Sequence, residues 1–173
     1  MGKLINAENE KRAAKRFLVA FAVFAAVTLP VMAFLCRAAY DSVRKDLISA
    51  WNTRAKNVCM AVQDYAYGDK NNSGRDVPQK GRYFIAGRAD NNGCSCEPCE
   101  VIPEKAELES SFENSVPREC CWVVAFSDGH VSECWVTAEQ KDVSELGPLE
   151  LEEQKKLFAP FRSKNDRIGY YCF

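Results

Sequence analysis

Cysteine is the residue type in this sequence that offers the most chemistry. The chain has nine cysteines and a single histidine, His130. Cys36 lies at the end of a long apolar run, and the other eight follow it: Cys59, Cys94, Cys96, Cys99, Cys120, Cys121, Cys134 and Cys172. An even number of cysteines in a small domain outside the cytoplasm is typical of a disulfide framework. We therefore predict that these eight form disulfides, although their spacing does not fix the pairing.

A structural zinc site is the main alternative for the central cysteines. Cys94, Cys96 and Cys99 lie close together, and Cys121 would complete a set of four thiolates. Cys120 and Cys134 are other possible fourth ligands. Free thiols are a third possibility. The leading expectation is disulfides, with no metal and no cofactor.

The sequence gives little support for an enzyme. A cysteine nucleophile needs a base, and His130 lies beside a predicted turn. No nucleophile elbow, phosphate-binding loop, HExxH helix or nucleotide fingerprint is found. Acidic residues dominate between Glu97 and Glu153, where we expect a solvated face. The net charge of −1 gives no support for nucleic-acid binding, and we expect no small-molecule substrate.

A membrane segment is the clearest element that the sequence predicts. Residues 17–36 form a run of 20 residues without a charge, between Arg16 and Arg37. A helix of that length spans roughly 30 Å, the thickness of the hydrocarbon core of a bilayer. We predict a transmembrane helix that contacts the lipid bilayer through 17–36. A cleaved signal peptide is the alternative, because Val31-Met32-Ala33 fits a cleavage site.

The flanking charges predict the orientation of this segment. The leader, residues 1–16, is basic and is expected in the cytoplasm; its cations are Lys3, Lys11, Arg12, Lys15 and Arg16. The rest of the chain is then extracytoplasmic, either periplasmic or extracellular.

Beyond the membrane segment the helical pattern continues through 37–67 as an amphipathic helix. Its apolar stripe recurs every three or four residues: Tyr40, Val43, Leu47, Trp51, Ala55, Val58, Val62 and Tyr65. Residues 68–173 are predicted to form a small cysteine-rich antiparallel β domain. Gly68 to Gln79 is expected to be a loop and Ala89 to Cys99 to be rich in turns. Short strands are expected at Gly81 to Ile85 and Ile168 to Phe173, and a helix at Leu149 to Phe158.

A β-hairpin is predicted around Asp128-Gly129, a pair typical of a two-residue type I′ turn. Continuous pairing from this turn places Phe126 opposite Val131, Val123 opposite Cys134, and Trp122 opposite Trp135. One face of the hairpin then packs on the long helix, and it carries Trp122, Val124, Phe126, Val131 and Trp135. Cys121 and Cys134 fall on the other face, and Cys120 points away from Cys121.

This order of parts resembles that of type IV pilins and pseudopilins. In that family a basic leader precedes an apolar helix, which continues as an amphipathic helix packed on a small antiparallel sheet. The resemblance is one of layout, because Arg16 precedes Phe17 where the family has glycine, and Phe21 occupies its glutamate position. The resemblance implies an α+β fold in which a transmembrane helix continues as an amphipathic helix and packs on a disulfide-stapled sheet.

The expected function follows from this layout. It is that of a single-pass, non-enzymatic, pilin-like structural or accessory protein of the cell envelope, with protein partners or self-association. Two alternatives remain: a membrane-tethered protein-binding module with an acidic interaction surface, and a Cys-ligated zinc module.

Overall fold

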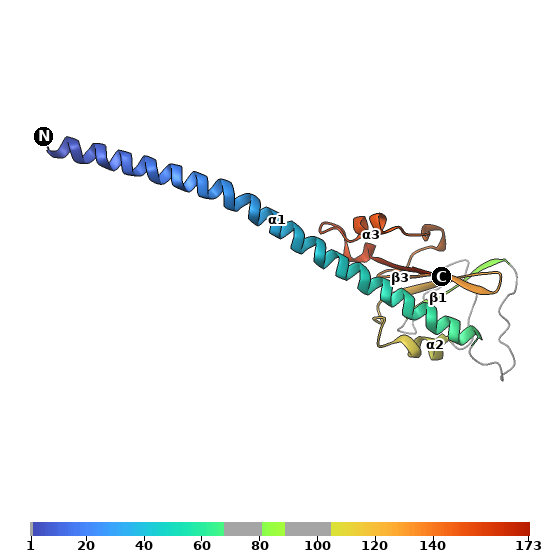
Figure 1. Ribbon diagram of the computed structural model, residues 1–173. Coiled ribbons are helices and arrows are strands. Elements are labelled where there is room, and N and C mark those ends of the chain that lie inside the picture. Colours follow the sequence, from blue (N-terminus) through green and yellow to red (C-terminus); the bar gives the residue numbers. More distant parts are fainter. Residues whose placement is uncertain (1, 68–80, 89–104) are drawn as a thin grey trace. The chain divides into compact units, whose positions relative to one another are not determined.

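The computed structural model describes the backbone of residues 2–67, 81–88 and 105–173 (Figure 1). The chain divides into two compact units, residues 1–43 and residues 44–173, here called unit 1 and unit 2. The predicted loop Gly68 to Gln79 and the segment Ala89 to Cys99 lie outside the described residues. The predicted helix at 37–67 is confirmed as part of helix α1.

Helix α1 extends from Gly2 to Tyr67, and its residues in unit 1 include the apolar run. Pro30 lies inside the helix. Thr28 donates its hydroxyl hydrogen to the carbonyl of Phe24 over 2.9 Å. Between Gly2 and Gly68 the sequence has no glycine, and Pro30 is its only proline, so one helix continues through this length.

Unit 2 contains a four-stranded antiparallel sheet whose strands follow one another in chain order. The strands are β1 (Arg82–Arg88), β2 (Cys121–Ser127), β3 (His130–Thr137) and β4 (Ile168–Cys172), in the order β1-β2-β3-β4. Helix α2 (Lys105–Phe112) precedes β2, and helix α3 (Leu151–Leu157) lies between β3 and β4. Short 3-10 turns, η1 (Val143–Glu145) and η2 (Lys164–Asp166), flank α3 along the chain. The fold is therefore α+β, and the predicted strands at 81–85 and 168–173 and helix at 149–158 are confirmed with small shifts of their ends.

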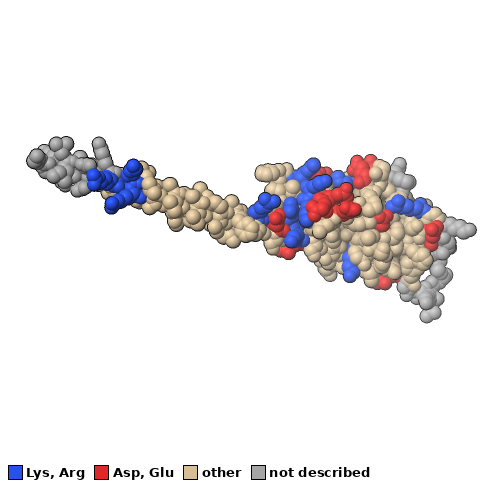
Figure 2. Space-filling model, turned by 45° about the horizontal axis from the view of Figure 1, so that its top comes forward, with Lys and Arg blue, Asp and Glu red and all other residues tan. Residues whose placement is uncertain are grey.

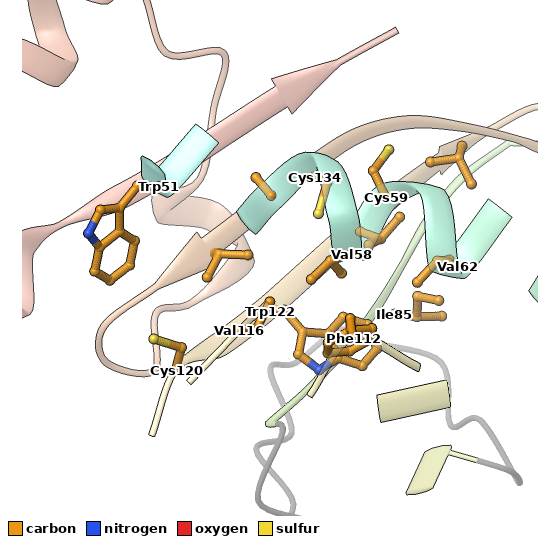
Figure 3. Close-up of a cluster of buried hydrophobic side chains, with 14 of the residues drawn as sticks. Trp51, Val58, Cys59, Val62, Ile85, Phe112, Val116, Cys120, Trp122 and Cys134 are labelled. Atoms are coloured by element: carbon orange, nitrogen blue, oxygen red, sulfur yellow. The ribbon is translucent and has the colours of Figure 1, made fainter. Parts of the chain in front are cut away.

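One face of the sheet packs on the part of α1 that belongs to unit 2. Trp122, Val124 and Phe126 of β2 lie in one buried cluster with Val58 and Val62 of α1. The cluster also includes Ile48, Trp51, Ala55, Cys59, Ile85, Leu108, Phe112, Val116, Cys120, Val131, Cys134, Val136 and Phe158. Figure 3 shows several of these side chains between the helix and the sheet. Burial of these apolar side chains is the main driving force for docking the helix.

The opposite face of the sheet is also buried. Trp135 and Cys121 lie in a second cluster that includes Ala86, Val123, Ala125, Val143 and Ile168. The indole of Trp135 donates to the carbonyl of Gly147 over 3.0 Å, so the segment between β3 and α3 is fixed onto this face. Both faces of β2 are thus covered, which explains why its sequence has a continuous apolar run rather than an alternating one.

The hairpin turn is confirmed, but part of its predicted register is wrong. Phe126 pairs with Val131 as expected, and both turn residues have positive φ (Asp128 49°, Gly129 79°). A β-bulge then shifts the pairing, so that Val123 lies opposite Trp135 and Trp122 opposite Val136.

The bulge reverses the faces of two predicted residues. The extra residue is Ser132, whose hydroxyl donates to the carbonyl of Ala125 over 3.1 Å. A one-residue shift moves each later side chain to the other face. Cys134 therefore lies in the cluster that contacts α1, and Trp135 lies in the opposite one. The prediction that Cys120 and Cys121 point to different sides is confirmed.

Candidate functional site

The apolar run of α1 exposes its side chains throughout. Every large apolar residue from Phe17 to Leu35 is between 53% and 71% exposed, so this segment is not a buried core helix. Among the described residues, α1 is the one helix that is long and apolar enough to cross a membrane. Helix α1 meets this description by its length and composition. A signal sequence near the N-terminus would meet it in the same way.

Basic residues bracket this run on both sides. Arg12, Lys15 and Arg16 precede it, and Arg37 follows it. Figure 2 shows a stretch of α1 whose visible face carries no charged side chain. Cations at each end of an apolar helix are placed to meet the phosphate groups of lipids, because their stems lie along the apolar surface and their charges reach the interface.

Four of the cysteines that follow the apolar run are buried in the core of unit 2. These are Cys59, Cys120, Cys121 and Cys134. Burial raises the pKa of the Cys59 thiol from 9.0 to about 12, with a smaller contribution from Cys172. Burial also raises the pKa of Cys120 to about 11 and that of Cys134 well above its ordinary value. Thiols of this kind stay protonated at neutral pH, so they are poor nucleophiles and poor metal ligands.

Disulfides remain a prediction for the described cysteines. Cys36, Cys59, Cys120, Cys134 and Cys172 carry thiols in the structure, which gives the disulfide framework no support. Cys59 and Cys134 lie in the same cluster, one on α1 and one on β3 (Figure 3). Cys172 is exposed.

Most of the cysteines in the predicted zinc alternative lie outside the described residues. These are Cys94, Cys96 and Cys99, whereas Cys121 is buried in the cluster on the far side of the sheet from α1. Within residues 12–67, 81–87 and 108–173, no three His, Cys, Asp or Glu side chains are grouped to hold a metal ion.

His130 lies at the hairpin turn, as expected. Its ring is exposed and 6.1 Å from the ring of Tyr67, between centroids. The hydroxyl of Tyr67 donates to the carbonyl of Gly129, so this tyrosine at the end of α1 fixes the turn. The position of His130 suits a structural contact between the end of α1 and the β2–β3 hairpin.

One residue of the predicted acidic face is buried instead. Glu109 on α2 is 1% exposed, and its carboxylate accepts a hydrogen bond from the indole of Trp122 over 3.0 Å. The ring of Phe112 packs edge-on against the same indole, 5.8 Å away between centroids. Glu109 therefore fixes α2 to the sheet, and the prediction that all these carboxylates are solvated is wrong at this residue.

A polar contact joins α1 to the edge strand β4. The side-chain oxygen of Asn52 accepts from the backbone N–H of Tyr170 over 3.0 Å and from the amide of Gln154 over 2.7 Å. The amide of Gln154 also lies 3.5 Å from the carbonyl of Ile168. Gln154 is 2% exposed. These side chains occupy hydrogen-bonding positions on the edge of β4 and protect them from pairing with another strand.

A second polar network uses the side chain of the same residue of β4, Tyr170. Glu133 on β3 accepts from Arg82 over 2.6 Å and from the hydroxyl of Tyr170 over 2.8 Å. Burial, and then the hydrogen bond to Glu133, raise the pKa of Tyr170 well above its ordinary value. The network links β1, β3 and β4, and it suits a structural role because the tyrosine keeps its proton.

An open groove of about 540 Å³ lies between α1 and α2. Its walls combine apolar and polar groups, including Met60, Asp64, Tyr65 and Phe112. A neighbouring hollow shares Asn57 and Ser115 with it and extends along α1 to Asp46.

Three of these residues were not predicted from the sequence: Glu109, Asn52 and Gln154. Glu109 carries a weak signal, since it lies one residue after Leu108 and three before Phe112 on a helix with an apolar face. Asn52 and Gln154 carry none, because they meet across 102 residues of chain.

Comparison with known proteins gave no match: no protein-family model, curated protein or solved structure is significantly similar to this chain.

Proposed function

We propose that this chain is a single-pass, membrane-anchored, non-enzymatic protein of the cell envelope, with a pilin-like structural or accessory role. The observation that carries the proposal is the exposed run of 20 uncharged residues on the helix that also supplies the core of unit 2. Anchor and domain share one helix, so the residues that enter the bilayer are covalently continuous with those that hold the sheet.

The anchoring mechanism is the partition of apolar side chains into lipid. About 20 apolar residues suffice to span the hydrocarbon core, and the helix satisfies its own backbone hydrogen bonds there. The basic leader favours a cytoplasmic N-terminus and places unit 2 outside the cytoplasm. In this position the domain presents its surface to protein partners or to further copies of the chain.

The anchor is tested by alkaline carbonate extraction of membranes from cells that express the chain. The full-length protein is expected to remain in the membrane pellet at its full size. A double variant, Phe24→Arg with Val27→Arg, is expected to move into the soluble fraction, because each charge at mid-membrane costs about 3 kcal/mol and two like charges cannot pair. Phe173→Asp adds a charge at an exposed phenylalanine outside the run and serves as the matched control.

Two outcomes would contradict the proposal. Release of the unmodified protein by carbonate would exclude a membrane anchor. A product shortened at its N-terminus to a residue near Ala33 would show a cleaved signal peptide instead.

A second candidate is a membrane-tethered binding module, and the groove between α1 and α2 favours it. Asp64 lines the groove and gives it acidic character, and Met60 adds an adaptable apolar contact. Co-purification of a partner that is lost in Met60→Glu would favour this candidate. Self-association that persists in detergent and in that variant would favour the pilin-like role.

A further inference from the structure

A phenylalanine lies fully in solvent on the loop that follows helix α3. Phe161 is 100% exposed, although a phenylalanine side chain gains about 2 kcal/mol from burial. Its neighbour Phe158 is buried and packs edge-on against Trp51 of α1. Phe158 thus anchors the loop, while Phe161 projects from it.

The loop has a defined backbone that holds this side chain outward. The N–H of Arg162 donates to the carbonyl of Ala159 over 3.1 Å, which closes a turn around Pro160 and Phe161. The hydroxyl of Ser163 then accepts from the N–H of Asn165 over 3.2 Å at the start of η2. The exposure of Phe161 is therefore a feature of an ordered turn.

The residues around Phe161 are basic. Lys156 precedes the turn, Arg162 and Lys164 follow it, and all three are exposed. No acidic residue occurs between Gln154 and Asp166. Asp166 lies 4.0 Å from Arg162, a long and exposed contact that leaves the cation open to water.

Both ends of this loop lie near Trp51 of α1, through Phe158 before the loop and Gly169 after it. Along β4, Gly169 is in contact range of Trp51, and Tyr171 lies under Lys56. The strand therefore runs along α1 in the same direction. Arg44 also lowers the pKa of Glu152 on α3, although Lys155 is the main cause of that shift.

The end of unit 2 that carries Arg44 is tied closely to the apolar run. Arg44 follows Cys36 by eight residues, or about 12 Å of helix. The headgroup region of a bilayer is roughly 5–8 Å thick on each side. This short covalent link limits how far the first residues of unit 2 can lie from the end of the apolar run.

We infer that the Pro160–Lys164 turn is a second, interfacial membrane contact, in which Phe161 enters the headgroup boundary and Arg162 and Lys164 bind anionic phospholipid headgroups. The inference rests on the proposed membrane anchor. An exposed aromatic side chain beside cations is the pattern of interfacial binding, and each cation near an anionic surface adds about 1 kcal/mol. The contact would restrict how unit 2 turns on its tether.

The test measures whether residue 161 reaches lipid in the full-length protein. The variant Phe161→Trp is reconstituted into vesicles of phosphatidylcholine and phosphatidylglycerol, with and without bromine on the acyl chains near the glycerol. Phe173→Trp is the matched control, because Phe173 is also exposed but lies beyond the opposite end of β4. The native tryptophans are present in both variants, so their quenching is a shared background.

The expected result is stronger quenching and a blue-shifted emission for Phe161→Trp than for Phe173→Trp. The difference should disappear when Arg162→Glu and Lys164→Glu are added, and it should shrink in vesicles of phosphatidylcholine alone. Equal quenching of the two variants in carbonate-resistant protein would overturn the inference and leave the anchor intact. Release of the protein by carbonate would overturn both.

Discussion

At the scale of single residues, Glu109 and Trp122 form the polar contact that fixes helix α2 in an apolar surrounding. The indole N–H of Trp122 is buried, and a buried donor that loses its acceptor carries the full cost of its lost hydration. Phe112 packs on the same indole, so the hydrogen bond and the ring contact orient Trp122 together. The carboxylate is thus a packing element of this domain.

We predict that Glu109→Ala lowers the free energy of unfolding by about 2–3 kcal/mol, through an unsatisfied indole and a small cavity. Glu109→Gln keeps an acceptor of similar shape and is expected to cost roughly 1 kcal/mol. The measurement is urea unfolding in detergent, followed by tryptophan fluorescence. Equal stability of the wild type and Glu109→Ala would show that the contact contributes nothing.

At the scale of elements, the backbones of α1 and β4 lie in direct contact. A Cβ atom at Gly169 would lie 2.1 Å from the backbone carbonyl oxygen of Trp51. The hydrogen bond from Tyr170 N–H to Asn52 depends on the same approach. Glycine is therefore required at this position, so that a helix backbone can lie directly against an edge strand.

We expect Gly169→Ala to separate β4 from α1 and to lower the melting temperature by several degrees, with a loss of about 2–4 kcal/mol. Gly147→Ala is the matched control, because no atom lies within 4 Å of the Cβ that it would add. The two variants are compared by circular dichroism during heating in detergent. A melting temperature for Gly169→Ala equal to that of the control would show that β4 does not depend on this contact.

The elements differ in how far the sequence could predict them. The long helix, the hairpin turn and the strand at Ile168 each have a local signal, in apolar periodicity or in turn residues, and each was found. The bulge at Ser132 was missed because a hydroxyl bonded to Ala125 leaves no mark on the apolar pattern. Its omission placed Trp135 and Cys134 on the wrong faces. Helix α2 was missed because eight residues give too short a periodic pattern.

The candidate sites also differ in whether they have a local signal in the sequence. The apolar run was found because its length is itself the physical requirement for crossing a membrane. The link between Asn52 and Gln154 depends on how distant segments meet, and local patterns do not contain that information. For the cysteines, spacing alone left disulfides, zinc and thiols open, since pairing is set by the fold.

At the scale of the whole molecule, the exposure of Cys172 allows the topology to be measured. The buried thiols of Cys59, Cys120 and Cys134 have raised pKa values and should react slowly in the folded domain. An impermeant maleimide-polyethylene glycol added to intact cells is expected to produce a gel shift that Cys172→Ser reduces by one increment. If Cys172 is in a disulfide, the shift will appear after treatment with an impermeant reductant.

Cys120→Ser is the matched control for this labelling, because it removes a buried thiol and should leave the Cys172-dependent shift unchanged. Either form of that shift, with or without reduction, would place unit 2 outside the cytoplasm. A shift that requires cell lysis in every case would contradict the predicted orientation.

The bond between Asn52 and Tyr170 also sets an order of events during synthesis. The two residues are 118 positions apart, so α1 cannot acquire its partner on β4 until the chain has been made through Tyr170. Contacts over such a distance form late, because a long loop must close first. The face of α1 that packs on the sheet is therefore synthesised well before the strands that cover it. During that interval the apolar side chains of Trp51, Val58 and Val62 lack the sheet that buries them in the folded domain.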